Sequence, residues 1–214
     1  MVLGIETAGD RGGIALLSSR GVHELVVPLG RAGGGIVPAA VDALLSLARA
    51  DREGIELIAV DIGPGSFTGL RIGLAFAKGM AQSLGIPMVG VRQTEAVARP
   101  LSWWPGKVAV WIHDRREFVY MAWATPDRVG MEAVLPWREA LAKVSEEPSA
   151  LLVGSGAVRF RAEVAAAGRR IACASEAFAH PRPGEIARLG WARFRTRGAD
   201  DLGEIEPHYV HKED

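Results

Sequence analysis

Residues 56–85 read ELIAVDIGPGSFTGLRIGLAFAKGMAQSLG, a segment that predicts a buried strand, a glycine turn and a helix in that order. The apolar run before the turn is typical of strands that are covered on both faces. The Gly-Pro-Gly turn at 63–65 interrupts this run, because glycine permits positive φ and proline cannot donate to a sheet. Ser66 and Thr68 carry side-chain oxygens that can cap the helix. We expect the rest of the chain to be built around this unit.

The turn and the start of the helix allow two roles. A helix N-terminus presents free backbone N–H groups and a positive dipole end, so the turn could hold a phosphate or a carboxylate. However, no Gly-Lys-Ser/Thr closes the turn as in a Walker loop, and the spacing misses the dinucleotide fingerprint by one residue. We favour the structural role, a tight turn with a helix cap, over an anion site. The residues concerned are Gly63, Gly65, Ser66, Thr68 and Gly69.

Small residues recur every four positions along one side of the helix, at Gly69, Gly73, Ala77 and Ala81. Each glycine costs about 1 kcal/mol relative to alanine in a helix interior. Their presence indicates that bulk is excluded so that another backbone can come close. Two alternatives stay open: this face packs on the protein's own sheet, or it receives a helix of another protein. The second alternative predicts that Gly73→Leu leaves folding intact and abolishes the complex.

The composition is that of a globular chain with balanced charge. Hydrophobic residues make up 49% of its 214 residues, enough to bury a core. Acidic and basic residues balance at 25 each, which disfavours strong nucleic-acid binding by the chain alone. A local basic patch stays open, formed by Arg31, Arg188, Arg193, Arg195 and Arg197. The single Cys173 excludes an internal disulfide, and its apolar neighbours predict a buried thiol. With neither a signal peptide nor an apolar run of about 18 residues, we expect a cytoplasmic protein without membrane contact.

The two halves of the chain show a similar order of elements, which predicts two domains, 1–100 and 101–214. The first half reads strand-strand-strand-helix-strand-helix-strand, with the C-terminal segment completing its domain, and the second half also opens with a hairpin. Beyond the segment quoted above, strands are expected at Val2–Thr7, Gly13–Ser18, Gly21–Leu29, Pro87–Val91, Lys107–His113, Glu117–Ala124 and Ala150–Val153. Helices are expected at Ile36–Ala50, Gln93–Arg99, Pro136–Lys143, Phe160–Ala167 and Arg182–Arg197.

The residues that carry catalysis or bind metals form no recognisable set. The five histidines are scattered, and no Ser-His-Asp, Cys-His or zinc arrangement can be assembled from the spacing. Asp61 ends the central strand, where open α/β sheets bind ligands. A role in orienting the glycine turn is at least as well supported for this carboxylate as catalysis. We therefore predict neither catalytic residues nor metal ligands.

Several segments resemble the TsaB (YeaZ-like) family. The most specific is the signature at Gly63–Ala81, GPGSFTGLRIGLAFAKGMA. Four further segments are in register with that family, namely the opening LGIETAGDRGGIALL, the hairpin IHDRREFVYMAW, the short VGSGA and the closing EPHYV. The resemblance implies an α/β fold with two related domains of the actin/Hsp70/sugar-kinase (ASKHA) type, each with a mixed sheet flanked by helices.

The resemblance also implies a role without catalysis. TsaB proteins bind and stabilise TsaD, which transfers the threonylcarbamoyl group to adenine 37 of tRNA (t6A37), and the ATPase TsaE joins that complex. TsaD holds its metal through a histidine pair on its first long helix, whereas the corresponding helix here has no histidine. The resemblance therefore implies a scaffold subunit without a cofactor of its own. ATP or ADP and the metal are expected on TsaD or at the complex interface, and tRNA is met only through the complex.

The partner surface implied by the resemblance lies on the helices of the first domain, through which family members also form homodimers. Carried over by position, it comprises Ile36, Ala40, Leu44, Leu70, Gly73, Leu74, Ala77 and Met80. Such an interface should bury on the order of 1,600 Å² in total. The chain departs from the family at Glu6, where an aspartate is usual, which puts an inherited phosphate contact in doubt.

An enzyme is the alternative function. A small ASKHA-type nucleotide hydrolase or a metalloprotease-like enzyme would need a nucleotide or metal site. Binding of ATP with Mg²⁺ by the isolated chain would distinguish this alternative from the scaffold.

Overall fold

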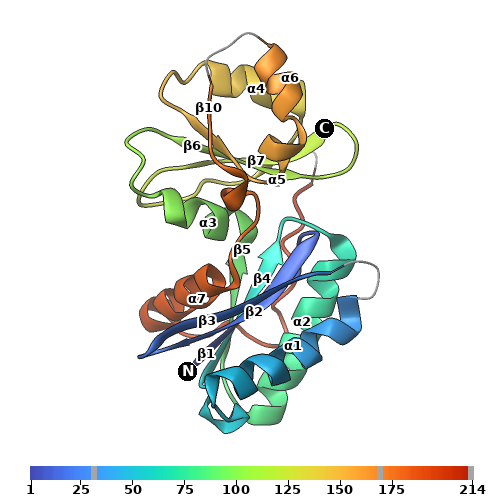
Figure 1. Cartoon of the computed structure of the whole chain (residues 1–214), viewed down its shortest axis with the longest axis vertical. Helices are drawn as coiled ribbons and strands as arrows, with labels where there is room; N and C mark the ends of the chain where they lie inside the picture. Colours follow the sequence, from blue (N-terminus) through green and yellow to red (C-terminus); the bar gives the residue numbers. More distant parts are fainter. Residues whose placement is uncertain (30–32, 168–170, 212–214) are drawn as a thin grey trace. The chain divides into compact units, whose positions relative to one another are not determined.

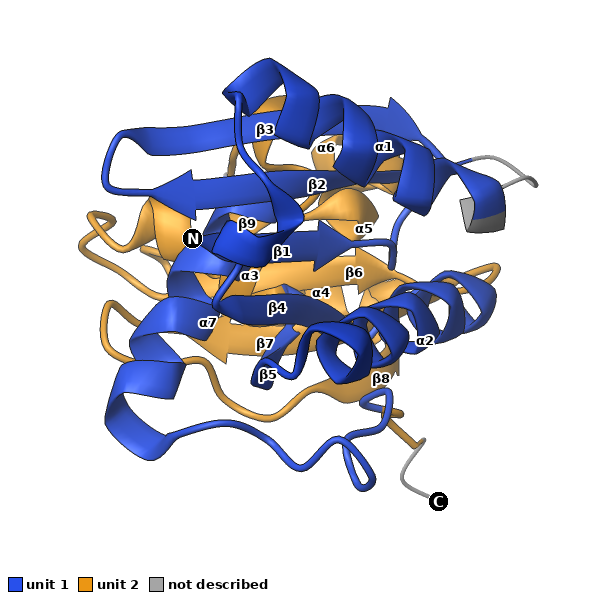
Figure 2. Cartoon of the chain, turned by 90° about the horizontal axis from the view of Figure 1, so that it is seen from below, with its two compact units in different colours: residues 1–93, 182–208 blue, residues 94–181, 209–214 orange. Residues whose placement is uncertain are grey.

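The computed structural model describes residues 1–29, 33–167 and 171–211, which form two compact units (Figure 1, Figure 2). The first unit contains residues 1–93 and 182–208, and the second contains residues 94–181 and the tail from 209. The first unit is therefore made of two separate stretches of the chain. The domain limits expected from the sequence stay a prediction.

Five strands form the sheet of the first unit in the order β3-β2-β1-β4-β5. They are β1 (Val2–Glu6), β2 (Arg11–Ser18), β3 (Gly21–Pro28), β4 (Leu57–Gly63) and β5 (Met88–Arg92). The first three pair antiparallel through short turns, whereas β4 is parallel to both β1 and β5. β1 is thus the strand at which the pairing changes, with Ile5 opposite Ile14 on one side and Val60 on the other.

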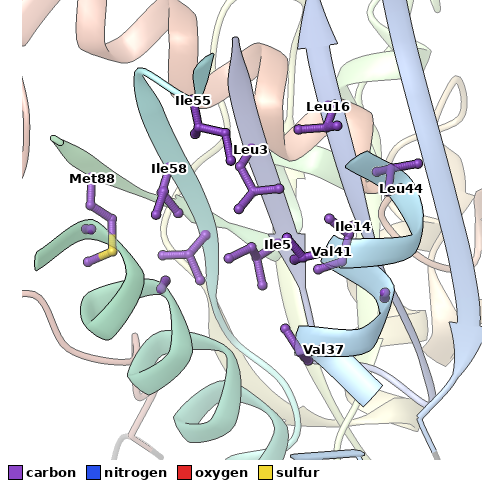
Figure 3. Close-up of a cluster of buried hydrophobic side chains, with 14 of the residues drawn as sticks. Leu3, Ile5, Ile14, Leu16, Val37, Val41, Leu44, Ile55, Ile58 and Met88 are labelled. Carbon is purple, nitrogen blue, oxygen red and sulfur yellow. The ribbon is translucent and has the colours of Figure 1, made fainter. Parts of the chain in front are cut away.

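Helices cover both faces of this sheet, α1 (Gly33–Ala48) and α2 (Phe67–Leu84) on one face and α7 (Pro183–Arg197) on the other (Figure 1). Successive side chains of β1 point to opposite faces of the sheet, so this strand contacts both helix layers. Leu3 and Ile5 belong to the core cluster beneath α1 and α2 (Figure 3). Gly4 faces α7, where an added Cβ would lie 3.0 Å from Ala187 Cβ. Glycine at this position therefore lets a helix from the far end of the chain lie directly on β1.

The small-residue face of α2 is buried against its own sheet. A Cβ on Gly69 or Gly73 would collide with Thr7, which follows β1 directly, and Ala77 and Ala81 are fully buried. The alternative in which this face receives a foreign helix is therefore wrong. Gly73→Leu cannot leave folding intact, because leucine has no space beside Thr7. The helix ends at Gly85, whose φ of 65° is the left-handed conformation that glycine adopts at helix C-termini.

The second unit repeats the topology of the first. Its strand order is β10-β9-β6-β7-β8, and numbering these strands from β6 gives the order of the first sheet. The strands are β6 (Val108–His113), β7 (Phe118–Ala124), β8 (Ala133–Pro136), β9 (Leu151–Val153) and β10 (Ala172–Cys173). The helices are α3 (Gln93–Ala98), α4 (Trp137–Ser145), α5 (Ser155–Arg159) and α6 (Arg161–Ala166). Two mixed five-stranded sheets flanked by helices confirm the predicted α/β fold class.

The sequence missed β8, β10 and α5, because elements of two to five residues carry too little periodicity to be detected. Cys173, predicted to be buried, is exposed in β10, and desolvation of its sulfur raises the pKa of the thiol. In the described part of the chain, none of the helices combines the length and apolar character that a membrane crossing requires.

We expect Gly73→Ala to lower the free energy of unfolding by about 1–3 kcal/mol, because the added methyl group collides with Thr7 Oγ1. Gly79→Ala on the same helix is the matched control, since a Cβ there meets nothing within 4 Å. This control should raise the free energy of unfolding by about 1 kcal/mol through helix propensity. Urea unfolding measures both, and a Gly73→Ala variant as stable as the wild type would contradict the close contact with Thr7.

Candidate functional site

The turn between β4 and α2 is held by the chain's own backbone. Gly63 has a φ of 103°, which favours glycine. Ser66 N donates to Ala8 O at 2.7 Å, and Ser66 Oγ caps the helix by accepting from Gly69 N at 3.2 Å. Thr7 Oγ1 donates to Gly69 O at 2.8 Å. The residues that follow β1 therefore cover one side of the glycine turn.

These contacts give the turn a structural role. An added Cβ on Gly65 would lie only 2.6 Å from Ala8 O, so the two turns touch through their backbones. A phosphate here would have to displace the Ala8 carbonyl from Ser66 N–H. The geometry thus lends no support to an anion site at the predicted residues Gly63, Gly65, Ser66, Thr68 and Gly69.

Two carboxyl side chains are buried where these turns begin. Glu6 ends β1 and Asp61 lies in the parallel neighbour β4, and both are at most 1% exposed. Glu6 Oε1 accepts from Ala8 N at 2.7 Å, and Asp61 Oδ1 accepts from Gly63 N at 2.7 Å. Each carboxyl group therefore orients the backbone two residues further along the chain, where the turn begins, which is the role that the sequence suggested for Asp61.

Burial raises the pKa of Glu6 well above its ordinary value, and the negative charge of Asp61 raises it further. Backbone hydrogen bonds from Ala8 and Gly9 act in the opposite direction. The protonated form of Glu6 is therefore stabilised relative to the ionised form, because two adjacent buried carboxyl groups do not readily ionise together.

The same pair does not suit a bound magnesium–nucleotide group. One oxygen of each carboxyl group already accepts a backbone N–H, and burial raises the pKa of Glu6, which disfavours the ionised form that Mg²⁺ prefers. Within residues 1–29, 33–167 and 171–211, no group of three or more His, Cys, Asp or Glu residues could hold a metal ion.

The eight predicted interface residues all lie on α1 and α2, but the structure turns six of them inward. Ala40, Leu44, Leu70, Gly73, Leu74 and Ala77 are buried in the first unit. Ile36 and Met80 are partly exposed. A buried side chain cannot contact a partner without unpacking the core, so the six belong to the core, which corrects the assignment by position. The apolar face that periodicity detects is the one that a helix packs on its own sheet.

A groove of about 380 Å³ lies between α1 and α2, and we call it the α1–α2 groove. Its lining residues are Pro38, Val41, Arg52, Ala75, Phe76, Gly79, Met80, Ser83 and Leu84. Ala75, Gly79 and Ser83 form a second row of small residues at four-residue spacing, and this row is exposed. On α1, 72% of the Leu47 surface is exposed. An exposed helix pair with a groove and small residues is suited to receive helices of another protein.

Sequence reasoning selected the buried row of small residues, because spacing alone does not distinguish the two rows. The residues within the rows do. Extended by one turn, the exposed row begins at Arg71 and ends at Ser83, whereas every residue of the buried row is glycine or alanine. Polar residues within a row are therefore the signal that could have identified the exposed row.

Comparison with known proteins relates the chain to one family. The family model for TsaD, tRNA N6-adenosine threonylcarbamoyltransferase, matches residues 34–197. The tRNA threonylcarbamoyladenosine biosynthesis protein TsaB of Bacillus subtilis is 29% identical over 218 residues, covering 98% of this chain and 93% of that protein. The tRNA N6-adenosine threonylcarbamoyltransferase of Chlorobaculum tepidum is 34% identical over 110 residues. That match covers 44% of this chain but only 31% of the transferase.

Two solved structures from Pseudomonas aeruginosa share the fold. YeaZ aligns over 98% of this chain and 99% of its own with a TM-score of 0.78 at 21% identity. A protein described as similar to peptidase YEAZ aligns over the same shares with a TM-score of 0.81 at 21% identity. Both units of the chain therefore have counterparts in solved structures of the same fold.

We expect Glu6→Gln to be more stable than the wild type at about pH 8, by roughly 1–3 kcal/mol. The pKa of Glu6 is raised in the folded state, so the unfolded chain releases this proton at lower pH. The stability that Glu6 contributes is therefore complete at low pH and is lost as the pH rises from the ordinary pKa through the raised one. Glutamine keeps an oxygen that can accept from Ala8 N but cannot ionise.

Urea unfolding between about pH 5 and pH 8 measures this difference, which should grow with pH. Glu204→Gln, at an exposed position, is the control and should follow the wild type at every pH. The assignment to Glu6 is contradicted if Glu6→Gln also follows the wild type.

Proposed function

The chain belongs to the TsaD family (tRNA N6-adenosine threonylcarbamoyltransferase) as a member of its TsaB (YeaZ-like) branch, and we propose that it is the subunit that binds and stabilises TsaD without catalysing the transfer itself. The family makes threonylcarbamoyladenosine in tRNA. The observation that carries the proposal is the exposed row of small residues along the α1–α2 groove in a chain of this family.

A transferase of this family would need residues that this chain lacks at the expected positions, which supports a subunit without catalysis. Its metal-binding histidine pair would lie on the first long helix, but none of the five histidines falls within α1. The chain also spans only 31% of the length of the Chlorobaculum transferase that it matches. The Glu6–Asp61 pair holds two turns in place and does not replace the missing ligands.

The α1–α2 groove is the proposed contact with TsaD. Helix pairs pack by inserting side-chain ridges into grooves, and small residues let the axes come close. Ala75, Gly79 and Ser83 provide such a groove on α2, while Leu47 on α1 and Phe67 on α2 provide exposed apolar surface. Ile36 and Met80 are the two predicted interface residues that this proposal retains.

The same surface is open to a second copy of the chain, so a homodimer would compete with TsaD for it. TsaE joins the TsaD complex in this proposal, and tRNA meets the chain only there. ATP or ADP and the metal are placed on TsaD or at its interface, because the pair of carboxyl groups described above does not fit them.

Ala75→Arg should abolish co-elution with TsaD on gel filtration and weaken the Kd by at least about a hundredfold, because it places a charge in a desolvated groove. Ala162→Arg on α6 adds the same charge at an exposed position of the second unit and should bind like the wild type. Both variants should unfold near the wild-type temperature, because both positions are exposed. Wild-type affinity of Ala75→Arg would refute the groove as the contact.

Isothermal titration of the isolated chain with ATP and Mg²⁺ should give no binding heat, because the residues at the turn do not fit a nucleotide. The complex with TsaD serves as the positive control in the same buffer. Stoichiometric ATP binding by the isolated chain would instead support the enzyme alternative, a nucleotide hydrolase of the same fold.

A further inference from the structure

Helix α7 concentrates positive charge in a chain whose charges cancel overall. Between Pro183 and Arg197 it carries four arginines and a single acid, Glu185. Its inner side is fixed to the sheet, since Ile186 and Ala187 are fully buried and a Cβ on Gly190 would collide with Ala59. The position of its outer side is therefore set by the core of the first unit (Figure 1).

The outer side presents one aromatic ring between two guanidinium groups. Arg188, Trp191 and Arg195 follow one another at helical spacing, and all three are exposed. Arg195 Cζ lies 5.7 Å from the centre of the Trp191 ring. The backbone positions of the two arginines are about 10 Å apart along the helix axis. We call these three residues the α7 patch.

The other arginines of α7 differ because they are used within the protein. Arg197 pairs with Asp200 at 2.9 Å, and Arg193 donates to Gly90 O. Both line a cavity of about 580 Å³ whose wall also carries Asp200, Asp201 and Glu204. By contrast, in the described part of the chain no carboxylate pairs with Arg195, and Arg188 forms only a solvent-exposed pair with Glu185 at 3.6 Å.

We propose that the α7 patch binds RNA, with the two arginines on phosphates and Trp191 against an unpaired base. Guanidinium groups bind phosphate through paired hydrogen bonds, and an exposed aromatic ring stacks on bases that are not in a helix. Charge complementarity thus selects a polyanion, and the ring between the charges selects one with planar bases. This inference rests on the proposed function, according to which the RNA is the tRNA that the TsaD complex binds.

The patch is too small to hold RNA by itself. Affinity from phosphate contacts grows with their number, and two arginines in a neutral chain supply few. We therefore expect the patch to add to a site formed by TsaD. α7 lies on the opposite face of the first sheet from α1 and α2, so the RNA contact and the α1–α2 groove do not overlap.

The experiment is a fluorescence anisotropy titration of labelled tRNA with the complex of the chain and TsaD, repeated over a range of salt concentrations. The double variant Arg188→Glu with Arg195→Glu should weaken the Kd about tenfold or more and reduce the salt slope by about one to two. Trp191→Ala should weaken the Kd about fivefold or more and leave the salt slope unchanged, because stacking releases no counterions.

The matched control is Arg20→Glu with Arg128→Glu, which makes the same charge change at two exposed positions elsewhere. Equal tRNA affinities of this control and the α7 double variant would overturn the inference. Loss of TsaD binding in the α7 double variant would overturn it too, since the patch would then contact a protein. Gel filtration of the wild type with TsaD shows separately whether the two proteins form a complex, as the proposed function requires. If no complex forms, the proposed function fails, and titrating the chain alone at low salt, where phosphate contacts are strongest, should still show weaker tRNA binding by the α7 double variant than by the control.

Discussion

Thr7 occupies the space that side chains at Gly69 and Gly73 would fill. This contact brings the end of β1, the glycine turn and α2 within hydrogen-bonding reach of one another. Ser66 N then reaches Ala8 O, and Thr7 Oγ1 reaches Gly69 O. Glycine is required because any Cβ would push α2 away from β1, and a close-packed interior does not accommodate such a shift without strain.

The close approach also explains why two carboxyl groups are tolerated in the core. Glu6 and Asp61 lie at the ends of adjacent strands, and each accepts a backbone N–H from the turn that follows. Burial and the charge of Asp61 raise the pKa of Glu6, so protonation of Glu6 relieves the repulsion that two buried charges would create. In other proteins this end of a parallel sheet is where ligands bind. Here the chain's own turns occupy it, which is consistent with a subunit whose function lies on its outer surfaces.

Those surfaces are the outer sides of helices whose inner sides are fixed by the same sheet. α1 and α2 present a groove with a row of small residues, and α7 presents two arginines around an exposed ring. Because the helices lie on opposite faces of one sheet, each surface can be occupied without blocking the other. Two independent outer faces on one sheet suit the proposed role, in which the chain binds a transferase on one face and RNA on the other.

The sequence alone determined the order of the long elements, the α/β class and the family, because these depend on local periodicity, turn residues and a specific signature at Gly63–Ala81. It also located the two helices of the groove and the arginines of α7. Only the tertiary structure decided which side of each helix faces outward. Spacing at Gly69, Gly73 and Ala77 resembles that at Ala75, Gly79 and Ser83, and only packing distinguishes them: Thr7 covers Gly73, whereas nothing lies within 4 Å of a Cβ on Gly79. The packing of α7 on the first sheet and the position of Glu6 beside Asp61 likewise depend on contacts between residues far apart in sequence. Periodicity does not detect such contacts.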